Sequence, residues 1–170
     1  GYVAAPLCRP SLASIFSGRH PHEHGITGND PRIPPGKKGG RTDDELAPLY
    51  DSIVDRIDDE PGLAHLLGEA GYLSLQTGKW WEGNPKTRGG FTHAMTHGDP
   101  KRGGRHGDAG LKISRQGIKP ITDFIAEAGK RKKPFFIWHA PFLPHTPHNP
   151  PARLFEKYRK KSPSRFIARY

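Results

Sequence analysis

The feature that most constrains the fold is a helix followed directly by a strand, and it occurs twice along the chain. Apolar residues at helical spacing predict a first helix over residues 63–70, and a short strand follows over residues 72–75. The same order recurs as a helix over residues 121–128 and a strand over residues 135–139. The apolar positions are Leu63, Leu66, Leu67 and Ala70 in the first helix and Ile121, Phe124, Ile125 and Ala128 in the second. This alternation favours an α/β fold with a largely parallel sheet and helices packed on both faces.

Two basic side chains follow the predicted strands. Lys79 comes shortly after the first strand, and His145 comes shortly after the second. In open parallel sheets, ligands bind beyond the carboxyl ends of the strands. The sequence therefore predicts that Lys79 and His145 lie near a ligand site at that edge of the sheet.

The only cysteine of the chain, Cys8, stands at the start of another predicted helix. Pro10 fits the first turn of this helix, and Gly18 can end it. Ile15 and Phe16 give it an apolar side. A helix N-terminus favours negative charge, so a thiolate, an oxyanion or a bound sulfate or phosphate is stabilised beside Cys8. The alternative is that Cys8 is a small structural hydrophobic residue, the commoner role of a single cysteine.

The charge balance is strongly basic, with a formal net charge of +10 over 170 residues. Such an excess suits a polyanionic partner such as nucleic acid, a membrane surface or a sulfated polymer. The basic run Lys101, Arg102 and Arg105 carries no interleaved aromatic residues, which stacking on single strands needs. We therefore expect a solvated basic surface and no specific nucleic-acid binding. No apolar stretch has the length of a membrane span, so no transmembrane segment is expected.

Residues 84–118 are rich in glycine and basic residues and show no sustained periodicity. This predicts a long insertion loop with little core, which either faces the substrate or is disordered. Only 33% of the residues are hydrophobic, so the core that the chain builds alone is expected to be modest. The first residue is Gly1 and no secretion signal is visible, and we expect the sequence to be a fragment of a larger protein.

Two other kinds of site can be tested against the sequence. The segment 20–24 contains three histidines and Glu23, which invites a zinc interpretation. These residues alternate in a proline-containing loop, whereas helical zinc motifs place two histidines one turn apart. A cysteine-dependent phosphatase would need an arginine six residues after Cys8, where the chain has Ser14. The sequence favours neither site.

Three segments, in the same order, resemble the signatures of the sulfatase family, which lies within the alkaline phosphatase superfamily. They are residues 6–19 around Cys8, residues 71–81 with the triplet Gly78-Lys79-Trp80, and residues 134–151 with a strand and a histidine loop. The resemblance implies a sulfatase-like α/β catalytic domain. It also implies that residues 1–170 are its N-terminal part, after the first metal-binding carboxylates and before the later ones.

The resemblance also implies the chemistry. In the family, the cysteine at the position of Cys8 is converted by a maturation enzyme to formylglycine, whose hydrated aldehyde is the nucleophile and a ligand of a divalent cation, usually calcium. Lys79 matches the lysine that binds the sulfate oxygens. His145 matches a histidine that contacts the sulfate and protonates the leaving oxygen, whereas His148 is expected to support the loop. The expected catalytic residues are therefore Cys8, Lys79 and His145, with Lys79 and His145 also binding substrate and Cys8 also binding the metal.

The implied activity is hydrolysis of sulfate esters in the manner of an arylsulfatase, on a sulfated small molecule or carbohydrate, in a periplasmic or secreted protein. Two positions depart from the family pattern: Leu12 stands where the family has an arginine, and Trp81 where it usually has a histidine. Trp81 is instead suited to stacking on a sugar or aryl ring. Two alternatives stay open, a phosphate or phosphonate ester hydrolase of the same superfamily and an inactive fragment that binds polyanions. The order Cys8-x-Pro10-Ser11 favours the sulfatase branch.

Overall fold

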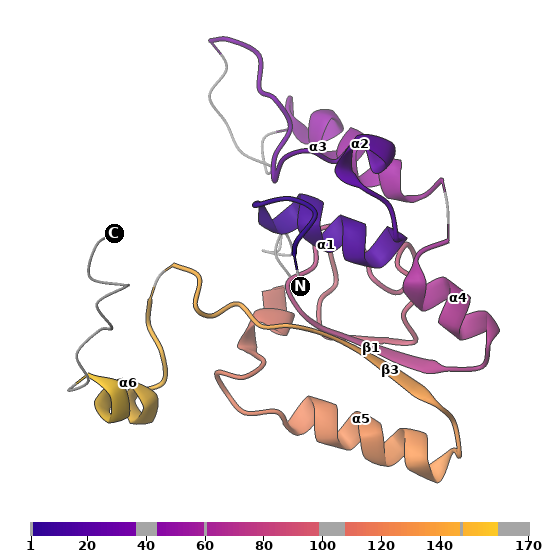
Figure 1. Cartoon of the computed structure of the whole chain (residues 1–170), viewed down its shortest axis with the longest axis vertical. Helices are drawn as coiled ribbons and strands as arrows, with labels where there is room; N and C mark the ends of the chain where they lie inside the picture. Colours follow the sequence, from indigo (N-terminus) through magenta and orange to yellow (C-terminus); the bar gives the residue numbers. More distant parts are fainter. Residues whose placement is uncertain (1, 37–43, 60, 99–107, 147, 160–170) are drawn as a thin grey trace.

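The computed structural model describes residues 2–36, 44–59, 61–98, 108–146 and 148–159. Its elements in chain order are α1 (Cys8–Ser17), α2 (Pro21–His24), α3 (Ala47–Val54), η1 (Asp55–Ile57), α4 (Leu63–Glu69), β1 (Leu73–Gly78), β2 (His93–Ala94), η3 (Asp108–Lys112), α5 (Lys119–Lys130), β3 (Phe135–Ala140) and α6 (Ala152–Tyr158). Among these described helices, none combines the length and the apolar character that crossing a membrane requires. The combination of strands and helices confirms the expected α/β class (Figure 1).

The strands form a parallel sheet in the order β2-β1-β3, with β1 in the centre. β1 pairs with β3 along its whole length, from Leu73 opposite Phe135 to Gly78 opposite Ala140. Every residue of β1 is buried, as expected for a parallel strand that is covered on both faces. The predicted parallel sheet is therefore confirmed, although β1 runs on to Gly78, beyond the predicted end at residue 75.

Hydrophobic side chains pack against both faces of this sheet, because successive side chains of a strand point to opposite sides. Figure 1 shows α5 on one side of the strands, with α1 and α4 on the other. The cluster between α5 and the sheet comprises Leu73, Leu75, Phe124 and Ala128, with Ile121 and Ile137 packed against it. The cluster on the opposite face comprises Ala13, Phe16, Ile26, Ile57, Ala64, Trp80, Phe91 and Trp138. The expectation of helices on both faces is thus confirmed.

Helix α1 packs closely on the start of α4. Phe16 of α1 is 2% exposed, and a Cβ atom at Gly62, the N-cap of α4, would collide with its ring. The approach therefore depends on the missing side chain at Gly62. At its other end α1 stops as predicted, since Gly18 takes the left-handed conformation that ends a helix.

Four residues that were expected to pack into the core are exposed, and Ala70 at the end of α4 is one of them. Ile15 is 57% exposed, Leu66 is 50% exposed and Ile125 is 40% exposed. In α4 the inward position belongs to Ala64, which is 0% exposed. Helical spacing marks an apolar arc, but the direction in which that arc faces is decided by the elements packed against it.

Residues 84–118 add more to the core than expected. β2 lies in this segment and extends the sheet. Phe91 is buried, and its ring stands edge-on to that of Trp80, with centroids 5.3 Å apart. The expectation of little core is therefore wrong for the described part of this segment. The basic run Lys101, Arg102 and Arg105 lies outside the described residues.

The histidine-rich segment forms the short helix α2 and not the expected loop. Pro21 occupies its first position, where a missing N–H costs nothing. The His20 N–H donates to Glu23 Oε2 at 2.7 Å, and this hydrogen bond lowers the pKa of Glu23. Gly25 ends the helix with a φ of 68°. Capping at both ends explains a helix in so short a segment.

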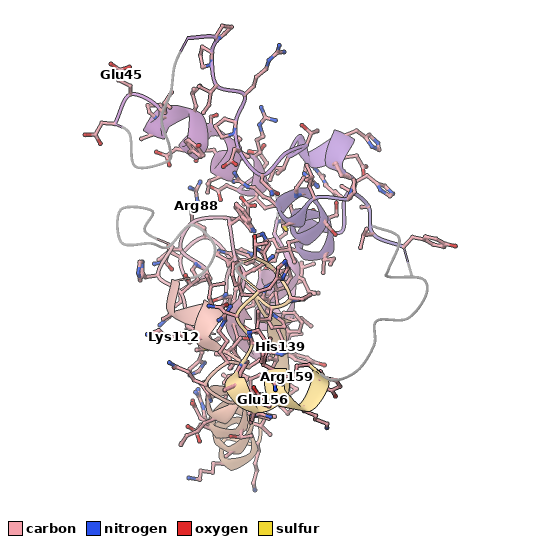
Figure 2. All side chains as sticks on the ribbon, turned by 90° about the vertical axis from the view of Figure 1, so that its left-hand side faces the viewer. Glu45, Arg88, Lys112, His139, Glu156 and Arg159 are labelled. Atoms are coloured by element: carbon pink, nitrogen blue, oxygen red, sulfur yellow. The ribbon has the colours of Figure 1, made fainter. Side chains whose placement is uncertain are left out.

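An exposed group of charges joins the segment after β1 to η1. Arg88 lies 2.6 Å from Asp55 and also contacts the carboxylate of Asp58. Figure 2 places Arg88 between the helical layer above and the sheet below. The hydrogen bonds that Arg88 donates to Asp58 and, to a lesser extent, to Asp55 raise the pKa of the guanidinium. This contact holds the long connection after β1 against the helices.

Candidate active site

Cys8 is the first residue of α1, and its side chain is partly exposed. The backbone of Leu7 is extended and precedes the helix, and its carbonyl accepts the N–H of Ser11 at 3.2 Å. The Arg9 N–H donates to Asn29 Oδ1 at 2.9 Å, so the loop after α2 supports the first turn. The helix start predicted at Cys8 is therefore present, and the thiol lies where negative charge is favoured.

A buried ion pair fixes this helix start. Arg9 Nε lies 2.9 Å from Glu82 Oε1 and Arg9 Nη2 lies 2.6 Å from Glu82 Oε2, in a bidentate arrangement. The two side chains are 1% and 4% exposed. Sequence reasoning missed this pair, although Arg9 adjoins Cys8 and Glu82 follows the Lys79 segment. The only feature of the sequence that could have indicated the pair is that Arg9 and Glu82 each stand close to a predicted site residue.

Lys79 follows β1 directly, and β3 holds its backbone on both sides. Its N–H donates to the carbonyl of Ala140 at 2.7 Å, and its own carbonyl accepts the indole N–H of Trp138 at 3.0 Å. Gly78 has a φ of 79°, and a Cβ atom there would collide with the Ala140 carbonyl. A glycine is therefore required where the chain leaves the strand towards Lys79.

The structure brings Cys8 and Lys79 together. Lys79 Nζ donates to Cys8 Sγ at 3.5 Å, although the two residues come from different predicted motifs. A cation next to a helix N-terminus gives a local environment that favours a bound oxyanion. The chemical roles assigned to the two residues remain predictions.

His145 lies in the loop after β3, and both His145 and Lys79 lie against the ring of Phe142. The imidazole of His145 lies against Phe142 with centroids 4.7 Å apart and the ring planes tilted by 32°, and Lys79 Nζ lies 5.4 Å from the centroid of the same ring. His145 Nδ1 lies 2.7 Å from the carbonyl of Thr146, so in the neutral ring Nδ1–H donates and Nε2 is left as the acceptor. Within the described part of the chain, no hydrogen bond joins His145 to Cys8 or Lys79.

The two positions that depart from the family pattern are both packed into the protein. Trp81 is 4% exposed, so the suggestion that it stacks on a substrate ring is wrong. Leu12 is partly buried and packs against the cluster that contains Phe16. The apolar side chains at these positions therefore serve the core beside the site.

The described residues do not fit the divalent cation that the resemblance implies. Among them, no group of three or more histidine, cysteine, aspartate or glutamate side chains is arranged to hold a metal ion. The ammonium of Lys79 donates a hydrogen bond to the thiol of Cys8. This positively charged environment suits a bound anion.

His24, the buried member of the histidine segment, has a structural role. Its Nδ1 accepts the N–H of Ile26 at 3.1 Å, so its Nε2–H donates to Ser14 Oγ at 3.1 Å and joins α2 to α1. Burial lowers the pKa of His24 and keeps the ring neutral. This contact explains the histidine without a metal.

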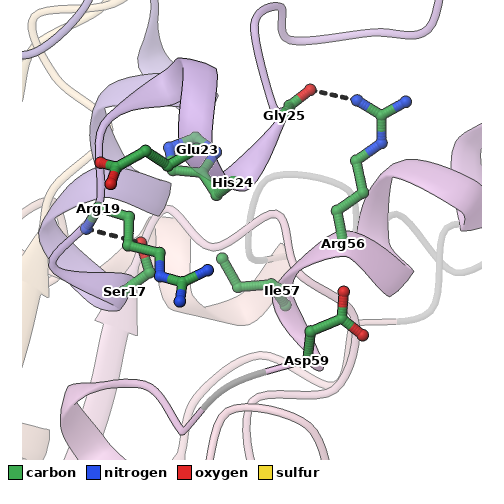
Figure 3. Close-up of a pocket in the computed structure, with 8 residues that line it drawn as sticks. All are labelled: Ser17, Arg19, Glu23, His24, Gly25, Arg56, Ile57 and Asp59. Carbon is green, nitrogen blue, oxygen red and sulfur yellow. Dashed lines mark hydrogen bonds between the residues drawn. The ribbon is translucent and has the colours of Figure 1, made fainter.

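Figure 3 shows a pocket beside this contact, formed by α1, α2 and η1. Its lining residues are Ser17, Arg19, Glu23, His24, Gly25, Arg56, Ile57 and Asp59. Two arginines and two carboxylates balance one another there, and Arg56 donates to the carbonyl of Gly25. The pocket includes neither Cys8 nor Lys79, and its charge selects no class of ligand.

The sequence was also compared with known protein families and with curated proteins. The family model described as Sulfatase matches residues 1–170, which include Cys8, Lys79 and His145. Curated proteins give no match. The matched range spans all three of the segments that carry the resemblance.

Proposed function

Because this chain belongs to the sulfatase family, we propose that it is an arylsulfatase-like hydrolase whose nucleophile is formed from Cys8 by conversion to formylglycine. Family membership by itself indicates a hydrolase of sulfate esters. In that reaction water cleaves the bond between sulfur and the ester oxygen, and the products are an alcohol and sulfate. The proposed substrate is a sulfated small molecule or carbohydrate.

The observation that carries the proposal is the 3.5 Å contact between Lys79 Nζ and Cys8 Sγ. A compact ammonium suits a sulfate group, since it acts as a point charge on an oxyanion of any orientation. β3 holds the backbone of Lys79, and the buried pair of Arg9 and Glu82 holds the start of α1. The nucleophile position and the cation are thus prearranged before a substrate arrives, which is the main requirement for electrostatic catalysis.

Cys8 also fits the modification. Its side chain is partly exposed at a helix start, and Leu7 before it is exposed, so a maturation enzyme can reach both. Formylglycine would supply a hydrated aldehyde: one hydroxyl would bond to sulfur as the alcohol departs, the other would give up its proton as sulfate leaves, and water would then add to the restored aldehyde. The proposed partner protein is therefore a formylglycine-generating enzyme.

Two further tasks, binding the sulfate and protonating the leaving alcohol, are assigned to Lys79 and His145. Lys79 holds the sulfate oxygens against Cys8. His145 keeps its Nδ1–H on the Thr146 carbonyl, which leaves Nε2 for the substrate. When Nε2 is protonated, it can give that proton to the leaving alcohol oxygen. Calcium is the cation that the resemblance implies, but the described residues do not fit it, so no step is assigned to a metal.

The test uses the full chain produced together with a formylglycine-generating enzyme. Mass spectrometry of the Cys8 peptide should show the mass of the aldehyde, and an aryl sulfate should be hydrolysed faster than the matching aryl phosphate. Cys8→Ala should abolish hydrolysis, whereas Ile15→Ala, on the exposed side of the same helix, should keep it. An unmodified thiol in every preparation would contradict the proposal, and faster hydrolysis of the phosphate would favour the phosphate-ester alternative.

A further inference from the structure

The Phe142 ring gathers three basic side chains at the edge of the candidate site. Lys79 Nζ lies 5.4 Å from the ring centroid, Arg115 Cζ lies 5.8 Å from it, and the centroid of the tilted His145 ring lies 4.7 Å from it. A cation is attracted to an aromatic face, but two cations that share one ring also repel each other. Among the described residues, neither Lys79 nor Arg115 forms an ion pair with a carboxylate.

Given the proposed function, we propose that Arg115 is a second oxyanion-binding residue beside Lys79, and that the preferred substrate carries a second oxyanion in addition to the sulfate that is cleaved. Lys79 binds the reacting sulfate next to Cys8. Arg115 binds the second group, a carboxylate or another sulfate on the same molecule. Its planar guanidinium can meet two oxygens of such a group at once.

The segment that carries Arg115 is fixed against the end of β1. η3 approaches so closely that a Cβ atom at Gly110 would lie 2.8 Å from the carbonyl oxygen of Gly78. Ser114 has a φ of 65°, and its hydroxyl lies 3.5 Å from Nε2 of His139 at the end of β3. Figure 2 shows Lys112 of η3 and His139 at the same level of the molecule. Arg115 therefore follows a turn that is held against the ends of β1 and β3, at the carboxyl edge of the sheet.

The guanidinium of Arg115 is also oriented. Nη1 donates to the carbonyl of Asn149 at 3.2 Å, in the loop that carries His145. A guanidinium has five N–H groups, so others remain for a ligand. Because Lys79 and Arg115 both approach one ring, a single small substrate can reach both cations.

Binding tests this arrangement without turnover. In the Cys8→Ala background of the full chain, calorimetry would compare an aryl disulfate with the aryl monosulfate of the same ring. The disulfate should bind more tightly. Arg115→Ala should weaken disulfate binding about tenfold and monosulfate binding less than about twofold, since a charged hydrogen bond is worth roughly that factor. Arg115→Lys should give an intermediate loss, and Lys112→Ala, an exposed cation on η3, should change neither affinity.

The results separate this inference from the proposed function. Equal affinity for the two ligands, equal losses in Arg115→Ala, or no measurable binding of either ligand would overturn the role of Arg115. Hydrolysis of the aryl monosulfate by the matured enzyme is measured separately and tests the proposed function alone. Turnover of the monosulfate with no preference for the disulfate would keep the enzyme assignment and reject the second oxyanion site.

Discussion

Arg9 and Glu82 form a bidentate ion pair in which both side chains are almost completely buried. Arg9 adjoins Cys8, and Glu82 stands shortly after Lys79, so the pair joins the two segments whose side chains meet at 3.5 Å. Its position indicates that it sets the distance between Cys8 and Lys79. The pair is therefore a positioning element and not a group that touches substrate.

Breaking this pair on one side should destabilise the fold strongly. Glu82→Ala leaves the Arg9 guanidinium buried without its carboxylate, and we expect a loss of about 3–5 kcal/mol in the free energy of unfolding, measured by urea denaturation. Lys119→Ala, which breaks an exposed pair with Asp123, should cost at most about 1 kcal/mol. A double replacement, Arg9→Met with Glu82→Leu, should recover much of the loss, and equal losses for Glu82→Ala and Lys119→Ala would show that the buried pair is unimportant.

The close approach of α1 and α4 predicts opposite effects for two glycines. Gly62→Ala forces a methyl group into the Phe16 ring and should destabilise the chain by about 1–3 kcal/mol. Gly68→Ala, within α4, meets nothing within 4 Å and should stabilise it by about 0.5–1 kcal/mol, because alanine favours the helix. Urea denaturation of both variants measures the difference. Similar effects at the two positions would rule out the tight contact at Phe16.

The buried His24 predicts a loss of stability in acid. Its folded-state pKa is lowered from the ordinary value of 6.5 by burial, so the unfolded chain binds a proton more readily. The contribution of His24 is therefore present above about pH 6.5 and is lost as the pH falls towards the lowered folded pKa. His24→Gln should flatten this part of the curve of unfolding free energy against pH. His22→Gln, at an exposed position of α2, should follow the parent, and an unchanged slope in His24→Gln would disprove the link.

Removing the cation next to Cys8 should affect catalysis more than folding. Lys79→Ala should lower kcat/KM for an aryl sulfate by about 10²–10³, the usual effect of losing one oxyanion donor. Lys86→Ala, an exposed cation in the following segment, should have no measurable effect. Steady-state kinetics with the matured enzyme and a melting curve for each variant measure the two properties. A fully active Lys79→Ala would remove Lys79 from the mechanism.

Local patterns in the sequence were sufficient for the class of fold and for the main parts of the candidate site. Helix and strand alternation predicted a parallel sheet, because the periodicity of a segment depends on its own residues. The helix start at Cys8 and its end at Gly18 also follow from neighbouring residues. The three ordered segments placed Cys8, Lys79 and His145 in one family before any contact between them was visible.

Only the tertiary structure decided which faces are buried and which distant residues meet. Ile15 and Leu66 are exposed while Ala64 is buried, because the contact of Phe16 with Gly62 orients both helices. The buried pair of Arg9 and Glu82 and the approach of Arg115 to Phe142 join residues that are far apart in the chain. No local periodicity encodes such contacts, because their free energy exists only once the sheet and helices have brought the partners together.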